Sequence, residues 1–242
     1  CVGTITYHID KAGIQIERLV FTGTTLQIPA EFDGTPVNSI GSFALSKCTA
    51  LESLTLPDSI TSISFQAFSN LENLTAVTLP DSIRSIGNSA FSGCTALTEV
   101  RLPKNLRAVE DYLFARCTSL KNVTLPEQPD YLGALAFSNT ALESIDIPAS
   151  VTSIGGSCFK NCTALQTVTF RNGLETIGDS AFFACSGLTE LSFPSTLKTV
   201  GGGMLEHVNG SLAPVDANGD PVDLSDKARI GSAGTTKLYT GG

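Results

Sequence analysis

Residues 74–91 read LTAVTLPDSIRSIGNSAF, residues 97–114 read LTEVRLPKNLRAVEDYLF, and residues 165–182 read LQTVTFRNGLETIGDSAF. The three stretches share the template LxxVxLPxx(I/L)xx(I/V)GxxAFxxCxx, which is about 23 residues long. Repeats of this length predict a solenoid, in which each repeat forms one coil and stacks on its neighbours. Because one coil cannot bury its own apolar residues, the stack supplies the hydrophobic core.

Two columns of residues fix the register of these repeats. Proline follows the first motif at Pro57, Pro80, Pro103, Pro126, Pro148 and Pro194. A second column contains Leu45, Phe68, Phe91, Phe114, Phe137, Phe159, Phe182 and Leu205, spaced by 23 residues except for one step of 22 after Phe137. We therefore expect the six phenylalanines to form one internal aromatic row.

The two halves of the template predict different local structures. The LxxVxL half alternates apolar and polar residues, which indicates a short strand with one buried face, and proline ends it. In the IGxxAFxxC half, the apolar spacing predicts short helical or 3₁₀ turns on the opposite wall. A glycine column (Gly87, Gly133, Gly155, Gly178 and Gly201) indicates a positive φ or a close approach of the next coil.

The template resembles the bacterial BspA-type leucine-rich repeat, also called the Treponema-type repeat, over about residues 20–208. This resemblance implies a right-handed leucine-rich repeat solenoid of the α/β horseshoe class, rich in β structure, with parallel strands on its concave face. It also implies a secreted or surface-attached bacterial protein that acts in adhesion or host contact. Similar proteins occur in some protists.

The repeat covers residues 29–208, which we expect to form the solenoid. Residues 1–28 would form an N-terminal cap, because two alternating segments flank the hairpin signal DKAG at 10–13. Residues 209–242, rich in glycine, aspartate and serine, would form a loop-rich C-terminal cap, with strands near 222–224 and 237–239. Such caps protect the exposed ends of a repeat array.

The overall charge argues against polyanionic partners. The chain has 15 basic and 23 acidic residues, a net charge of −8, so neither nucleic acid nor an anionic membrane surface is expected to bind it. No apolar run is long enough for a transmembrane helix. A chain that starts at Cys1 fits a mature lipoprotein with a lipid anchor on that sulfur; the alternative is that this sequence simply begins there.

Residues capable of catalysis or metal binding are few. The column cysteines (Cys48, Cys94, Cys117, Cys162 and Cys185) share their place with Leu71, which favours small buried apolar residues over a metal or redox ladder. His8 and His207 lie near opposite ends of the array. Residues 216–223 carry aspartates but lack the order of a calcium loop. We therefore predict no enzyme, no metal and no cofactor.

The best candidate for a binding site lies on the outward positions of the LxxVxLP strands. Most are small and polar, but the middle of the array carries larger side chains, and six of the 15 basic residues fall between 84 and 121. Arg84 and Arg107 share a column, and tyrosines replace small residues nearby. The candidate partner-binding residues are Arg84, Glu99, Arg101, Arg107, Tyr112, Lys121, Asn122, Tyr131 and Asp146. The alternative is an ordinary solvated face.

These features predict a non-enzymatic, extracytoplasmic scaffold that binds a host extracellular or surface protein, a role that rests on the resemblance. One alternative is a structural module that spaces another domain from the cell surface. Another is a glycan-binding module, which ranks lower because the predicted concave face lacks tryptophan and tyrosine.

Overall fold

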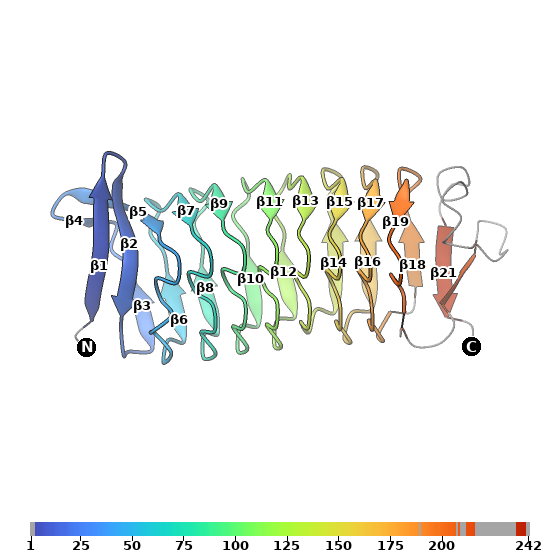
Figure 1. Ribbon diagram of the computed structural model, residues 1–242, viewed down its shortest axis with the longest axis horizontal. Helices are drawn as coiled ribbons and strands as arrows, with labels where there is room; N and C mark the ends of the chain where they lie inside the picture. Colours follow the sequence, from blue (N-terminus) through green and yellow to red (C-terminus); the bar gives the residue numbers. More distant parts are fainter. Residues whose placement is uncertain (1–2, 189, 207, 209–211, 216–235, 241–242) are drawn as a thin grey trace.

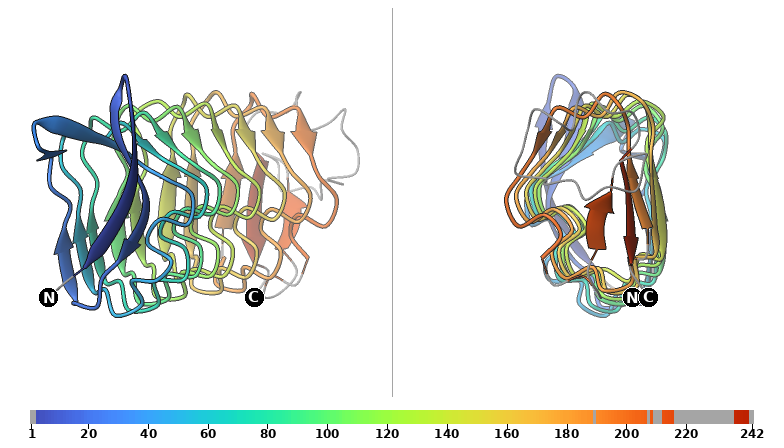
Figure 2. Two further views of the ribbon diagram at one scale, coloured as in Figure 1. Left: turned by 60° about the vertical axis from the view of Figure 1, so that its left-hand side comes forward. Right: turned by 90° about the vertical axis from the view of Figure 1, so that its right-hand side faces the viewer.

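The computed structural model describes residues 3–188, 190–206, 208, 212–215 and 236–240. Cys1, His207, the aspartates of 216–223 and the predicted strand at 222–224 therefore lie outside the described residues. In the described part, coils stack side by side along the long axis of the molecule (Figure 1). Each coil contributes one strand to each of two walls, and the walls enclose the core (Figure 2).

The first wall, which we call the strand face, consists of the LxxVxL strands. They are β3 (Thr25–Gln27), β6 (Ser53–Thr55), β8 (Ala76–Thr78), β10 (Glu99–Arg101), β12 (Asn122–Thr124), β14 (Ser144–Ile147), β16 (Thr167–Phe170) and β18 (Glu190–Phe193). Neighbouring strands that pair do so in parallel, each residue beside its equivalent in the next coil. The predicted parallel strands are confirmed. The ladder is interrupted between β8 and β10 and between β12 and β14.

The second wall is another parallel ladder, which the sequence reasoning missed. It contains β5 (Thr35–Ile40), β7 (Ser62–Ile63), β9 (Ser85–Ile86), β11 (Ala108–Val109), β13 (Tyr131–Leu132), β15 (Ser153–Ile154), β17 (Thr176–Ile177) and β19 (Thr199–Val200). This ladder is interrupted once, between β9 and β11. Its strands are short, so their alternation is too brief to stand out in the sequence.

The prediction of helical or 3₁₀ turns is wrong for the described residues, which contain turns but no helix. In each coil a residue adopts a positive φ, for example Gln66 at 51° and Ser89 at 58°. A right-handed helix cannot contain such a residue. N–H groups instead alternate: Gln66 and Phe68 donate to the next coil, whereas Ala67 and Ser69 donate within their own turn. The turns thus link the coils as a third ladder.

The core follows the predicted columns. Phe68, Phe91, Phe114, Phe137, Phe159 and Phe182 are fully buried, and successive ring centroids lie 5.1–5.8 Å apart. The aromatic row is therefore confirmed. The glycine column reflects close approach: a Cβ on Gly155 would lie 2.4 Å from the backbone nitrogen of Ala134, in the preceding coil.

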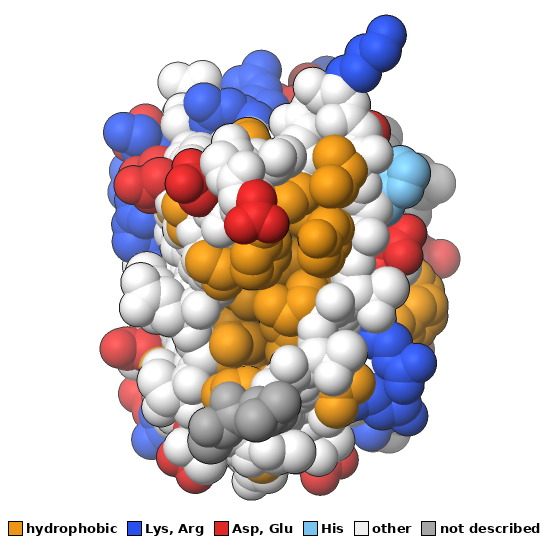
Figure 3. Space-filling model, turned by 90° about the vertical axis from the view of Figure 1, so that its left-hand side faces the viewer, with side chains coloured by type: hydrophobic (Ala, Val, Ile, Leu, Met, Phe, Trp, Pro, Cys, Tyr) orange, Lys and Arg blue, Asp and Glu red, His pale blue; other side chains and the backbone are white. Residues whose placement is uncertain are grey.

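The N-terminal end begins with an antiparallel hairpin of β1 (Thr4–Asp10) and β2 (Gly13–Val20). Asp10 Oδ1 closes its turn by accepting hydrogen bonds from the N–H groups of Ala12 and Gly13. Since β2 pairs with β5, the hairpin extends the second wall, and β4 (Glu31–Phe32) joins at the side. Hydrophobic side chains remain visible on this end (Figure 3).

At the C-terminal end, β21 (Thr236–Thr240) pairs antiparallel with β18 and with β20 (Leu212–Val215). A reversed strand thus follows β18 on the strand face, where a further coil would continue the array. The division into solenoid and caps at residues 28 and 208 stays a prediction.

Candidate binding surface

The middle of the strand face is hollowed. Outward side chains alternate with buried ones along the strands, as in β10, where Val100 is buried between exposed Glu99 and Arg101. A shallow depression of about 690 Å³ extends over β8, β10 and β12. Its lining consists of Thr75, Ala76, Val77, Thr78, Leu79, Thr98, Glu99, Val100, Arg101, Asn122 and Thr124. Of the predicted site residues, Glu99, Arg101 and Asn122 meet here.

The depression lies where the array has fewest backbone hydrogen bonds between coils. In the described residues, no backbone hydrogen bond joins β8 to β10 or β9 to β11. The turns still connect the two coils here, through bonds such as that from the Phe91 N–H to the Leu113 carbonyl. The stacked rings of Phe91 and Phe114 also span this junction.

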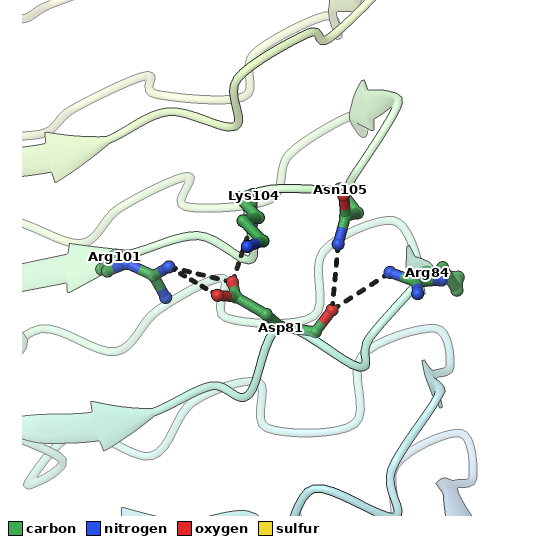
Figure 4. A network of polar contacts seen from close by, with 5 residues as sticks. All are labelled: Asp81, Arg84, Arg101, Lys104 and Asn105. Carbon is green, nitrogen blue, oxygen red and sulfur yellow. Dashed lines mark hydrogen bonds and ion pairs between the residues drawn. The ribbon is translucent and has the colours of Figure 1, made fainter.

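Asp81 makes polar contacts across the same junction (Figure 4). Its two carboxylate oxygens each lie 2.9 Å from Nη2 of Arg101, and Oδ1 also accepts the Lys104 N–H at 3.0 Å. Its backbone carbonyl accepts from Arg84 Nη1 and Asn105 Nδ2. The hydrogen bond from Arg101 holds the pKa of the Asp81 carboxyl below its usual value. The sequence analysis did not single out Asp81.

Three of the six basic residues between 84 and 121 pair with acidic residues. Arg101 pairs with Asp81, Arg107 lies 3.7 Å from Asp130, and Lys121 lies 3.6 Å from Glu143. Arg84 donates to a backbone carbonyl. Acidic residues therefore accompany half of the cluster, and these exposed pairs contribute little to stability.

The remaining predicted residues lie apart from the depression. Tyr112 is exposed in a turn with a positive φ of 57°. Tyr131, in β13 of the second wall, donates its hydroxyl to Glu110 at 2.8 Å, and burial together with this carboxylate raises the pKa of Tyr131 to about 12. Asp146, on β14, accepts hydrogen bonds from Nε and Nη2 of Arg171. These three residues do not join Glu99 and Arg101 in the depression.

The column cysteines are buried, as the sequence indicated. Their thiols donate to main-chain carbonyls: Cys94 to Phe68 at 3.2 Å, and Cys117 to Phe91 at 3.1 Å. Burial raises the pKa of Cys94 to about 12 and that of Cys117 well above its usual value. Among the described residues there is no group of three or more histidine, cysteine, aspartate or glutamate side chains placed to hold a metal ion.

We expect these thiols to stay unreactive toward an aromatic disulfide reagent in the native protein and to react on denaturation. The unfolded thiol pKa is about 8.5, so the stabilisation from Cys94 is complete below that pH and is lost as pH rises toward 12. The loss of stability is measured as the difference between the denaturant midpoints at neutral and at alkaline pH, in a protein that carries Cys1→Ser. Cys94→Ala should make this difference smaller. Rapid labelling of the native protein would contradict this prediction.

The fold and its surface define a class: a repeat solenoid with a polar strand face. The chain belongs to the BspA-type leucine-rich repeat family, whose model matches six copies over residues 14–127, 38–166 and 95–211. No match is found among curated proteins. No helix in the described part of the chain is long and apolar enough to span a bilayer.

Solved bacterial structures share the fold. A leucine-rich cell surface protein of Faecalibacterium prausnitzii is 25% identical, with a TM-score of 0.59 over 85% of this chain and 73% of its own. A leucine-rich repeat protein of Bacteroides ovatus is 26% identical, with a TM-score of 0.52 over 84% and 78%. The leucine-rich repeat protein of T. pallidum is 24% identical, with a TM-score of 0.57 over 94% of this chain and 93% of its own. This likeness is evidence for the fold only.

Proposed function

We propose that this protein is a non-enzymatic surface or secreted scaffold that binds a protein partner, as in adhesion or contact with a host surface. The mid-array depression over β8, β10 and β12 carries this proposal, because it gathers charged and amide side chains on an otherwise small and polar face. The similar protein of Faecalibacterium prausnitzii is described as a cell surface protein, which supports a location outside the cytoplasm.

The geometry favours contact with a broad partner over capture of a small molecule. The depression is shallow and open, whereas sites for small ligands are concave and bury most of the ligand. The stacked coils hold the strands rigidly, so little conformational entropy is lost when a partner docks on them. A structural spacer would have the same stack but would need no such depression.

We expect Thr124→Arg to block the depression and to weaken partner capture at least about tenfold, a cost of about 1.4 kcal/mol. Thr169→Arg is the matched control, because Thr169 is exposed on the same face in β16, outside the depression. Immobilised wild type and both variants are compared for capture of host extracellular matrix proteins and mucins. Equal capture by all three proteins, or no capture by the wild type, would contradict the proposal.

A further inference from the structure

The guanidinium of Arg101 contacts Asp81 through only one of its three nitrogen atoms. Its Nη2 atom makes both contacts to Asp81, whereas neither Nη1 nor Nε has a hydrogen-bond partner in the described part of the chain. The close-up shows both contacts to Asp81 starting from the same nitrogen of the Arg101 guanidinium (Figure 4). Its side chain is 54% exposed. Since Asp81 also accepts the Lys104 N–H, its own position is fixed.

Arg171 provides a contrast on the same face. Asp146 accepts from both Nε and Nη2 of Arg171, so an internal carboxylate already occupies that side of the guanidinium. Arg101, in comparison, is restrained but still offers donors to an incoming acceptor. A cation that is fixed before binding loses less side-chain entropy when it takes a ligand.

The surroundings of Arg101 supply further hydrogen-bonding groups. The β10–β12 register places Thr124 beside Arg101 and Asn122 beside Glu99. Thr78, on the other side of the interrupted ladder, also lines the depression. Hydroxyl groups can donate to one oxygen of a carboxylate while Arg101 donates to the other.

Glu99 adds a negative charge to the same depression. It is exposed on β10, two residues before Arg101, and none of the ion pairs among the described residues includes it. Residues two apart on a strand project from the same face, roughly 6.8 Å apart. A polyanion would be repelled by Glu99, and a polycation by Arg101. An extended polypeptide has the same side-chain spacing and can place opposite charges against both.

We propose that the depression recognises an extended polypeptide segment bearing one acidic and one basic residue two positions apart. The acidic side chain meets Arg101 with the flanking threonine hydroxyls, and the basic side chain meets Glu99. This inference rests on the proposed function and names the chemistry of the partner. Asp81 acts as a positioning residue for Arg101.

Capped heptapeptides test the inference by NMR titration of the ¹⁵N-labelled protein, following the amide signals of Arg101 and Asn122. The probes are Thr-Ser-Asp-Ser-Lys-Ser-Thr, its reverse order and the neutral Thr-Ser-Asn-Ser-Gln-Ser-Thr. We expect one charged order to bind at least about fivefold more tightly than the neutral peptide at low salt, and to lose that preference at high salt. Arg101→Gln should abolish the preference, and Arg171→Gln should leave it intact.

Glu99→Gln gives a second test that leaves the Asp81 network in place; it should reduce the preference for the charged peptide. The inference is overturned if neither charged order binds better than the neutral peptide, if Arg101→Gln keeps the preference, or if a sulfated oligosaccharide binds more tightly than both charged peptides. If Thr124→Arg still blocks protein capture in that event, the proposed function stands and only this inference fails.

Discussion

Replacing Phe114 by alanine is expected to lower the free energy of unfolding by about 3–5 kcal/mol. Phe114 is fully buried, and its ring lies between those of Phe91 and Phe137, with centroid distances of 5.5 and 5.8 Å. The substitution leaves a cavity in the middle of the row, and the neighbouring coils cannot close it without breaking the hydrogen bonds between their turns. Chemical denaturation followed by circular dichroism measures the loss.

Phe43→Ala is the matched control for this change. Phe43 is 48% exposed, packs edge-on against Phe65, and also adopts a positive φ of 58°. Phenylalanine and alanine both carry a Cβ, so the backbone strain is similar before and after the change. We expect a loss below about 1 kcal/mol. Equal losses for the two variants would show that the phenylalanine row does not form the core.

Replacing Gly155 by alanine is expected to destabilise the fold by about 1–3 kcal/mol through a steric clash. The added Cβ would lie 2.4–2.8 Å from three atoms of Gly133 and Ala134, all in the backbone of the preceding coil. Backbone atoms cannot move aside as a flexible side chain can, so the two coils must separate locally. Ser64 and Glu110 stand in place of this glycine in two other coils, so the column accepts a Cβ there and the expected cost is moderate.

Gly156→Ala, at the next residue, controls for the general effect of replacing glycine. Its added Cβ would lie 3.3 Å from the Asp179 carbonyl oxygen and 3.9 Å from the Asp179 backbone nitrogen, with no contact below 3.3 Å. In thermal denaturation, the melting temperature of Gly156→Ala should be close to that of the wild type. The melting temperature of Gly155→Ala should be lower by several degrees. A wild-type melting temperature for Gly155→Ala would mean that the coils do not approach closely there.

Features that repeat every 23 residues could be predicted from the sequence. The period alone places the phenylalanines in one row. The partners of the ion pairs Arg107–Asp130 and Lys198–Glu175 are also one period apart in sequence. Asp81 and Arg101 are 20 residues apart, so they occupy different columns and meet only because their side chains reach sideways across the junction. Comparison of equivalent positions in the repeats therefore identified Arg101 as a candidate but not Asp81, which holds Arg101 in place.

The turns formed by the IGxxAFxxC half show a second limit of prediction from sequence patterns. The apolar spacing of isoleucine, alanine, phenylalanine and cysteine suits a helical turn, and those residues are indeed buried. The backbone between them depends on left-handed residues such as Ser89 and Ser157, whose N–H groups bond to the next coil. Serine adopts this conformation only when neighbouring structure imposes it, so no local signal in the sequence showed it.

Engineered disulfides provide the most direct measurement of the central claim, which is that successive repeats stack in register to build one strand face. Thr55 pairs with Thr78 across β6 and β8, so their Cα atoms should lie about 4.8 Å apart, within the range of a disulfide. Oxidation of Thr55→Cys/Thr78→Cys should give a cross-link detectable by mass spectrometry. Thr55→Cys/Ala76→Cys, displaced by two residues to roughly 8 Å, should stay reduced. Cross-linking of the displaced pair but not the paired one would contradict the account.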